Sequence, residues 1–438
     1  MSYSRAARIK QNMDPLPPRS ARDVVKNTPI EIWKEVVDAL LYDPVVFRCD
    51  PYYPGCNFHT ALTQWNDWKH LRNLEIQRGI LRLVSRSWKS LADSYPQRYF
   101  EPIRSRDYGY QVAQTLSARR LHLGMFCSSC GCVWLCSCGV CDECYENLSS
   151  ESPVESSLLS QLAGSLFNVE ILSLPDTELR MGILGTDPTK LSVQLPNLRS
   201  LSINGTSYEL ATAMIAFPNL VFLDLEVEPL SMQHTPGFRA TLPSLRTLRL
   251  QVWDLGGLSE LSKWSMPKLS HLDLAARGDF APLVFQFVEV QGRNISSLRL
   301  QSDYLLALPE NFWGQVPQLQ YLGTSCLEFL DDEQRRLPKG HPFCTLGILE
   351  QEGIMEEART AVMHYQRRWE TIKTIADSHS WKDVPADFLE LSREVDAYAH
   401  THTRSPCWRC MAGLYRICAE AGIRYEDRAG TLYEEIWP

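Results

Sequence analysis

Two closely spaced pairs of cysteines are the residues in this sequence best suited to metal chemistry. Cys127 and Cys130 form one C-x-x-C pair, and Cys141 and Cys144 form a second, with ten residues between the pairs. Zinc binds four thiolates in a tetrahedron, and each C-x-x-C turn presents two of them. The spacing predicts a structural zinc site, or zinc knuckle, because four cysteine ligands leave no open position for catalysis.

Three further cysteines lie between the two pairs, so the sequence does not decide which thiols bind the metal. Cys138 is an alternative ligand to Cys141 or Cys144, and a cysteine-rich loop without metal is the other interpretation. The first residues lack an apolar signal segment, and no apolar run is long enough to span a membrane. We therefore expect a cytoplasmic or nuclear protein, whose cysteines are thiols or metal ligands rather than disulfides.

Enzymatic motifs do not accompany the cysteines. The sequence contains no G-x-S-x-G, P-loop, H-E-x-x-H or dinucleotide-binding fingerprint. A net charge of -8 gives no global positive field of the kind that nucleic-acid-binding proteins carry. We expect a protein that is not an enzyme, that has no organic cofactor, and that binds neither nucleic acid nor membrane.

From about residue 165 to residue 350 the chain repeats the unit P-x-L-x-x-L-x-L, which is clearest from Pro196 to Ile203. The middle leucines of eight copies recur 22 to 29 residues apart, which is the period of leucine-rich repeats. These leucines are Leu172, Leu201, Leu223, Leu248, Leu272, Leu298, Leu322 and Leu346. The sequence predicts an α+β protein: an α/β solenoid over residues 165–350 and a helical C-terminal cap over 351–438.

Strand alternation divides the side chains of each repeat between two faces. Leu201 and Ile203 point into the core, so their neighbours in the strand point outward. The outward positions mix both charges with aromatic rings, which suits a protein partner, although many are expected to be solvated strand positions. The predicted substrate-binding residues are Phe222, Asp224, Glu226, Arg249, His271, Asp273, Arg299 and Tyr321.

Two helical segments precede the repeats, after a basic stretch at residues 1–27 that is expected to be a disordered tail. Thr28 and Glu31 predict a capped helix start, and helical periodicity returns at Leu81. Residues 43–66 between them are rich in Pro, Tyr and Gly and are expected to be loop-like. Neither helix can bury its apolar stripe alone, so the two should pack on each other or on a partner.

Two motifs in these helices, Pro29–Trp33 and Leu81–Ala92, resemble the F-box in the form found in fungal proteins. Together with the repeats they resemble a fungal F-box/leucine-rich-repeat protein. On this resemblance, residues 28–100 are an F-box-like domain with an insertion at 43–70. Residues 120–148 then form a cysteine-rich connector to the repeats.

The resemblance implies a substrate-recognition adaptor of an SCF-type (Skp1–cullin–F-box) ubiquitin ligase. The F-box would bind a Skp1-like adaptor, and the repeats would hold an unknown protein substrate. The residues that match the Skp1-binding surface are Pro29, Ile30, Ile32, Trp33, Val36, Leu81, Val84, Trp88 and Leu91. The alternative, favoured by the length of the insertion, is a leucine-rich-repeat interaction scaffold without ligase association.

Overall fold

The computed structural model describes residues 28–53, 58–95, 98–100, 118–122, 166–174, 192–205, 214–227, 239–252, 258–259, 261–276, 281–302, 308–324, 337–349, 371–378, 408–427 and 430–432. The chain forms two compact units. One contains the chain up to Tyr42 together with Arg72–Tyr95, and the other contains Asp43–Leu71 together with the chain from Pro96 onward. The segment expected to be an insertion in the helical domain therefore packs with the repeats.

The helical unit is built from α2 (Ile30–Leu41), the part of α4 (Trp68–Val84) that follows Leu71, and α5 (Arg86–Ser94). Val37 and Leu41 on the predicted apolar stripe of α2 are buried against Leu81 of α4 and Ala92 of α5. A hydrogen bond of 2.7 Å from the Tyr95 hydroxyl to the Asp38 carboxylate also joins α5 to α2. The two predicted helices therefore pack on each other, which is one of the two arrangements expected from their apolar stripes.

The starts of α2 and α5 differ in how they are capped. Pro29, not Thr28, stands at the N-cap position of α2, and the Pro29 side chain makes no capping hydrogen bond. The helix therefore begins one residue later than a cap at Thr28 predicts. At α5, the Ser85 hydroxyl accepts a hydrogen bond of 3.2 Å from the backbone N–H of Trp88. Ser85 is extended, so it ends α4 and starts α5 in a single step.

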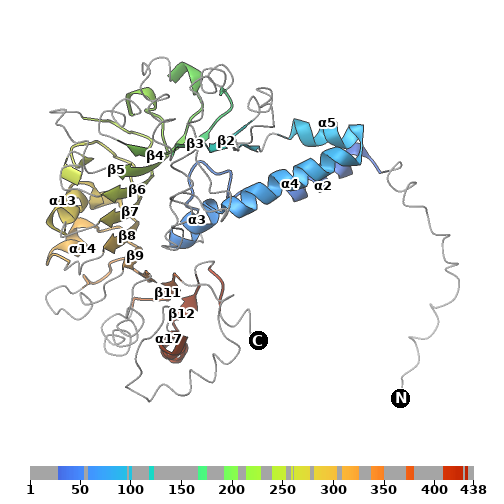
Figure 1. Cartoon of the computed structure of the whole chain (residues 1–438). Coiled ribbons are helices and arrows are strands. Elements are labelled where there is room, and N and C mark those ends of the chain that lie inside the picture. Colours follow the sequence, from blue (N-terminus) through green and yellow to red (C-terminus); the bar gives the residue numbers. More distant parts are fainter. Residues whose placement is uncertain are drawn as a thin grey trace, which may run out of the picture. The chain divides into compact units, whose positions relative to one another are not determined.

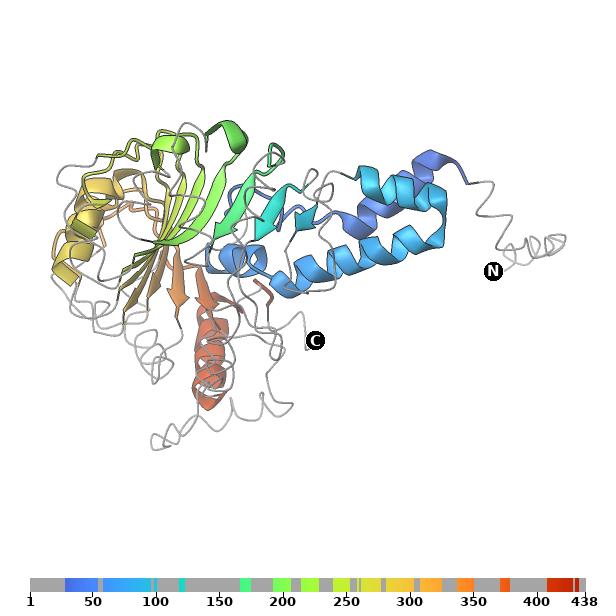
Figure 2. The same ribbon diagram turned by 45° about the horizontal axis from the view of Figure 1, so that its top comes forward.

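The second unit is a solenoid whose strands form one twelve-stranded sheet, parallel throughout and paired in sequence order (Figure 1). The strands are β1 (Tyr99–Phe100), β2 (Arg120–His122), β3 (Ile171–Leu174), β4 (Ser200–Gly205), β5 (Phe222–Val227), β6 (Thr247–Val252), β7 (His271–Ala276), β8 (Ser297–Ser302), β9 (Tyr321–Thr324), β10 (Thr345–Ile348), β11 (Thr374–Asp377) and β12 (Arg424–Glu426). Figure 2 shows that the sheet is curved.

The middle leucines of the repeats pair across this sheet in the predicted register. All eight lie in a single row, from Leu172 of β3 to Leu346 of β10. The same row begins earlier, with Phe100 and Leu121, and continues through Ile375 and Tyr425. The repeat prediction is therefore confirmed, and the sheet is longer than the sequence indicated.

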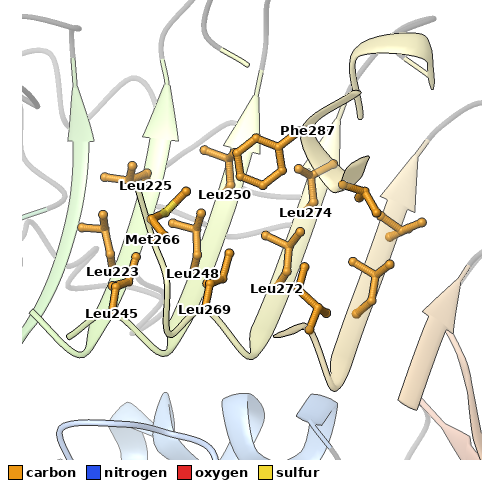
Figure 3. Packing of buried hydrophobic residues seen from close by; sticks show 14 of the residues in the cluster. Leu223, Leu225, Leu245, Leu248, Leu250, Met266, Leu269, Leu272, Leu274 and Phe287 are labelled. Carbon is orange, nitrogen blue, oxygen red and sulfur yellow. The ribbon is translucent and has the colours of Figure 1, made fainter. Parts of the chain in front are cut away.

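The leucine face of the sheet forms the core of the solenoid. Leu223, Leu248 and Leu272 point to one side of neighbouring strands and are fully buried (Figure 3). Met266 and Phe287 pack on them from outside the sheet, the latter from α13 (Ala281–Gln291), and α14 (Phe312–Gln315) covers a later part. Each such side chain contributes about 1.5–3 kcal/mol by leaving water, so the repeats are stable only when stacked.

The ends of the solenoid correct two predicted boundaries. β1 and β2 lie before residue 165, and β11 and β12 lie beyond residue 350. The C-terminal region is therefore not wholly helical, although α17 (Trp408–Ala421) packs Leu414 onto the end of the core. These strands escaped the repeat pattern because Ile375 and Tyr425 stand where the inner repeats place leucine.

Candidate interaction surfaces

The predicted Skp1-binding residues on the helical unit differ in exposure. Pro29, Ile30, Ile32 and Val84 are exposed, whereas Trp33, Val36, Trp88 and Leu91 are half-buried. Leu81 is only 7% exposed and belongs to the core of the unit. Its placement among surface docking residues is therefore wrong, because its side chain holds α4 against α2 instead of meeting a partner.

Trp33 and Trp88 bring the two motifs of the helical unit together. Their ring centroids are 4.8 Å apart with planes tilted by 55°, although more than fifty residues separate them in the sequence. Aromatic pairs at this distance stabilise contacts beyond the area that they bury. Because both rings remain half-buried, the pair joins the two helices and also contributes to the surface.

A second apolar surface of the helical unit was missed by the sequence analysis. Ile76, Ile80 and Leu83 on α4 are 59%, 59% and 87% exposed. Their spacing of four and three residues places them on one face of the helix, and exposed Val84 lies beside them. This spacing in the sequence is the signal that predicts the face, and it begins before Leu81. Contiguous exposed apolar side chains mark binding surfaces.

The sheet face opposite the leucines, called the inner face, carries the predicted substrate-binding residues. Phe222, His271, Asp273 and Tyr321 are buried, with exposed fractions of 0%, 6%, 2% and 5%. Asp224, Glu226, Arg249 and Arg299 are half-buried. The expectation that these strand positions are open to a partner is wrong for the four buried residues, because the chain itself covers them.

The covering segment consists of residues 43–53 and α3 (Phe58–Trp65), and α3 lies within the curve of the sheet (Figures 1 and 2). Phe58, Leu62 and Trp65 are buried there in one cluster with Phe222 of the inner face. The Trp65 and Phe222 rings have centroids 4.8 Å apart. The segment was expected to be loop-like, but Phe58, Leu62 and Trp65 recur at the helical spacing of four and three.

A buried arginine anchors this covering segment at one end. The Arg120 guanidinium lies 4.0 Å from the centroid of the Trp65 ring and donates hydrogen bonds to the carbonyls of Val46 and Trp65. The Trp65 indole N–H in turn donates to the Arg48 carbonyl over 2.8 Å. Burial lowers the pKa of Arg120 to about 9, so the side chain remains a cation at neutral pH. Because the buried Arg120 cation contacts the Trp65 ring and two carbonyls of the covering segment, the segment is held in a fixed position on the sheet.

Hydrogen bonds from β4 and β6, on either side of β5, hold the middle of the covering segment. The Ser200 hydroxyl donates to the Cys49 carbonyl, and the Thr247 hydroxyl donates to the Asp50 carboxylate over 2.7 Å. The Cys49 thiol donates to the Glu170 carboxylate over 3.1 Å, and burial raises its pKa to about 12. This thiol is therefore neutral, with no thiolate character for redox or nucleophilic chemistry.

His271 of the inner face stacks under the covering segment. Its ring centroid is 3.7 Å from that of Tyr52 and 5.7 Å from that of Phe58. Burial, together with the charge of Arg246, lowers the pKa of His271 to about 3. The imidazole is therefore neutral at physiological pH, as a stacked aromatic ring, and is not poised as an acid or base.

On the same face, beside the column of side chains that contains His271, four residues on successive strands form a charge ladder of alternating sign. The Arg249 guanidinium is 3.6 Å from the Asp224 carboxylate and 3.3 Å from that of Asp273, and Arg299 is 2.9 Å from Asp273. Burial disfavours the charge on Arg249, but the two carboxylates outweigh burial and raise its pKa. The ladder neutralises itself, so these predicted substrate contacts already bind one another.

The remaining predicted features fall partly outside the described residues. Cys127, Cys130, Cys141 and Cys144 lie there, so the zinc site and the cysteine-rich connector stay predictions. Within the described ranges, no three histidine, cysteine or acidic side chains converge as metal ligands. In that same part of the chain, no helix has both the length and the apolar character needed to cross a membrane.

Comparisons with known proteins give little beyond the fold. The sequence matches no known family and no curated protein. A leucine-rich repeat-containing protein of Legionella pneumophila, LegL7, is similar in structure with 14% identity and a TM-score of 0.37, over 78% of this chain and 94% of that one. The TLR13–ssRNA13 complex gives 12% identity and a TM-score of 0.27, over 60% of this chain and 45% of that one.

Similarity at this level carries no argument about activity or ligand. The register of the leucine row and the helices outside it define the class on their own. The chain contains a parallel-sheet solenoid that resembles leucine-rich-repeat proteins, and it also contains a unit of packed helices. Folds of this class act as scaffolds for protein–protein contacts.

Proposed function

We propose that this protein is a substrate-recognition adaptor of an SCF-type ubiquitin ligase. The helical unit docks on a Skp1-like adaptor, and the solenoid holds a protein substrate near the ubiquitin-loaded enzyme. The chain itself performs no chemistry and acts by proximity. The observation that carries the proposal is the exposed apolar surface of the helical unit, on α2 and α4.

Two groups of side chains make up this docking surface. Ile30 and Ile32 at the start of α2 are 48% and 45% exposed, although the helix has apolar positions buried elsewhere. Ile76, Ile80 and Leu83 form the stripe on α4. A unit with so small a core gains little by leaving five large apolar side chains in water, so a partner that covers them is the simplest reason for their presence.

The F-box resemblance adds the identity of the partner. The motif from Pro29 to Trp33 opens α2, and the motif from Leu81 to Ala92 contains the turn between α4 and α5. Trp33 and Trp88 are in contact, so the two motifs form one local structure despite the long insertion. The insertion packs in the other unit, so its length does not disrupt the helical one.

Co-purification with a Skp1-like adaptor tests the proposal. The test variant replaces Ile32, Ile80 and Leu83 with Gln, all of which are exposed, so folding should be unaffected. The matched control replaces Val193, Ile215 and Val290 of the solenoid with Gln, which are 63%, 61% and 57% exposed. Circular dichroism of all three proteins shows whether each folds alike.

We expect the wild type and the control to retain the adaptor and the test variant to lose it. Loss of three apolar interface contacts weakens binding by more than tenfold, since each is worth about 1–2 kcal/mol when fully covered. If folded wild type fails to bind, the ligase function is ruled out. The solenoid then remains an interaction scaffold without a ligase, which is the second candidate function.

A further inference from the structure

A row of arginines runs across the starting ends of the first strands of the solenoid. In each of these repeats, one residue directly precedes the first paired residue of the strand. Its backbone N–H donates to the carbonyl of the equivalent residue one repeat earlier, over 2.7 to 3.0 Å. These bonds place six side chains in order, one repeat apart: Arg98, Arg119, Glu170, Arg199, Val221 and Arg246. We call this set the arginine row.

The charge of this row is opposite to that of the whole protein. Four of its six members are arginines and one is an acid, whereas the chain has a net charge of -8. Glu170 is already engaged, because its carboxylate accepts from Arg119 over 2.9 Å and from Cys49 over 3.1 Å. Arg199 and Arg246 are exposed, and among the described residues no carboxylate forms an ion pair with either.

The charge of Arg246 acts on the groups around it. Burial raises the pKa of Asp50, while Arg246 and Arg48 oppose that shift. Burial lowers the pKa of His271, and Arg246 lowers it further. The Asp50 carboxylate accepts hydrogen bonds from the Thr247 hydroxyl of β6 and from the Tyr52 N–H of its own segment, so it is already engaged. Arg48 adds a further cation from the covering segment itself.

Two of the three columns of side chains on the inner face are closed to a partner. The first column, which contains Phe222 and Tyr321, lies under the covering segment. The second column is the charge ladder, whose members form ion pairs with one another. The third column, which includes Glu226 and Gln251, is half-buried, so the arginine row is one of two surfaces open to the protein that the proposed function requires. The arginine row is exposed at Arg199 and Arg246 and belongs to rigid, hydrogen-bonded repeats.

The spacing of the row indicates the chemistry of the partner. Neighbouring strands are about 4.8 Å apart, so Arg119, Arg199 and Arg246 follow one another at about 10 Å, or two strands. An extended peptide covers that distance in about three residues. A phosphate is usually held by several converging arginines, whereas separate guanidinium groups each suit one carboxylate.

We propose that the arginine row binds an extended acidic segment of a protein partner, with Asp or Glu at about every third residue. The inference rests on the proposed function, and it names the substrate class that the solenoid accepts. Arg199 and Arg246 supply the two main contacts. Arg119 extends the row at one end, with Glu170 setting its orientation.

Fluorescence anisotropy with a labelled peptide tests this proposal on the full-length chain. The probe carries glutamate at every third position; comparison probes replace glutamate with glutamine or with phosphoserine, and a fourth is single-stranded RNA of equal charge. The test variant is Arg199→Gln with Arg246→Gln. The matched control is Arg239→Gln with Arg293→Gln, two exposed arginines of the solenoid outside the row.

We expect the wild type and the control to bind the glutamate peptide alike, the test variant at least tenfold more weakly, and the glutamine peptide not at all. Added salt should weaken binding, since the charges are exposed. Equal binding by the two variants, no saturable binding by wild type, or tighter binding of the phosphoserine peptide or RNA would overturn the proposal. Retention of the Skp1-like adaptor by the test variant separates this outcome from failure of the proposed function.

Discussion

The inner face of the solenoid and the surface of the helical unit both carry large apolar side chains, but their surroundings differ. Phe222 and Tyr321 on the inner face are 0% and 5% exposed, because the covering segment lies over them. Ile80 and Leu83 on α4 are 59% and 87% exposed. One surface has its partner within its own unit, and the other has none among the described residues of its unit.

This difference identifies which surface is free for function. Burial of Phe58, Leu62 and Trp65 against the sheet contributes several kilocalories per mole, at about 1.5–3 kcal/mol for each side chain. A partner of ordinary affinity would not readily displace such a segment. The covering segment is therefore part of the solenoid fold, and the exposed surface of the helical unit is the better place to seek a partner.

Removing the main anchor of the covering segment should have the largest effect on stability. Trp65→Ala leaves a cavity against Phe222 and removes the ring that faces the buried Arg120 cation. We expect a loss of about 4–5 kcal/mol in the free energy of unfolding, measured by urea denaturation followed by circular dichroism. Lys69→Ala, at an exposed position, is the control. A loss below about 1 kcal/mol would mean that the segment is not packed as described.

Breaking the charge ladder should cost less. Asp273→Asn removes the carboxylate that pairs with both Arg249 and Arg299, which keep partial contact with solvent. We expect the free energy of unfolding to fall by about 2–3 kcal/mol, below the cost for a fully buried pair. The matched change is Asp67→Asn on an exposed residue. A tolerated Asp273→Asn would show that the two arginines are solvated in solution.

His271 should make the covered inner face sensitive to acid. Its folded pKa of about 3 lies below the ordinary value of 6.5, so the unfolded chain takes up the proton first as pH falls. Stability is thus lost from about pH 6.5 downward, by about 1.4 kcal/mol per pH unit for one proton. The raised pKa of Asp50 acts in the opposite direction, so the comparison with His271→Phe isolates the histidine.

In that comparison, His271→Phe should keep the aromatic stack with Tyr52 and flatten the dependence of the unfolding free energy on pH between 6 and 4, as measured by urea denaturation at several pH values. Parallel curves for the two proteins would show that the imidazole is solvated and that the segment does not cover it.

Changes on the surface of the helical unit should have the smallest effect on stability. Leu83→Gln alters a side chain that is 87% exposed, so the melting temperature should shift little. The free energy of unfolding should change by no more than about 0.5 kcal/mol. Binding of a Skp1-like adaptor, measured by calorimetry, should weaken clearly. Leu81→Gln is the opposite case: it buries a polar group in the unit's core and should unfold that unit. Equal melting for both variants would contradict the packing described.

The sequence predicted the repeats well, because their evidence is local and periodic. The spacing of the middle leucines from Leu172 to Leu346 gave the register of the sheet, since each repeat must bury the same position. The ends were harder, because Ile375 and Tyr425 occupy the same row outside any recognisable repeat. Edge repeats are expected to be atypical, since they stack on one side only.

The sequence could not predict that the covering segment lies over the inner face. That contact joins Trp65 to Phe222 and Tyr52 to His271, over more than a hundred residues in each case, and nothing in the local pattern specifies the partner. Strand alternation correctly separated Phe222 from the leucine core, but it says nothing about what lies on the other side. Exposure was therefore assumed where the chain supplies its own cover.

Hydrogen exchange of the backbone amides, with and without a Skp1-like adaptor, tests the central claim most directly. In the free protein, we predict slow exchange in α3 and in β5 to β7, because the covering segment and the inner face protect each other. The adaptor should then slow exchange in α2, in the second half of α4 and in α5, and leave α3 unchanged. Fast exchange in α3, or an adaptor that protects the solenoid and not the helical unit, would contradict the account.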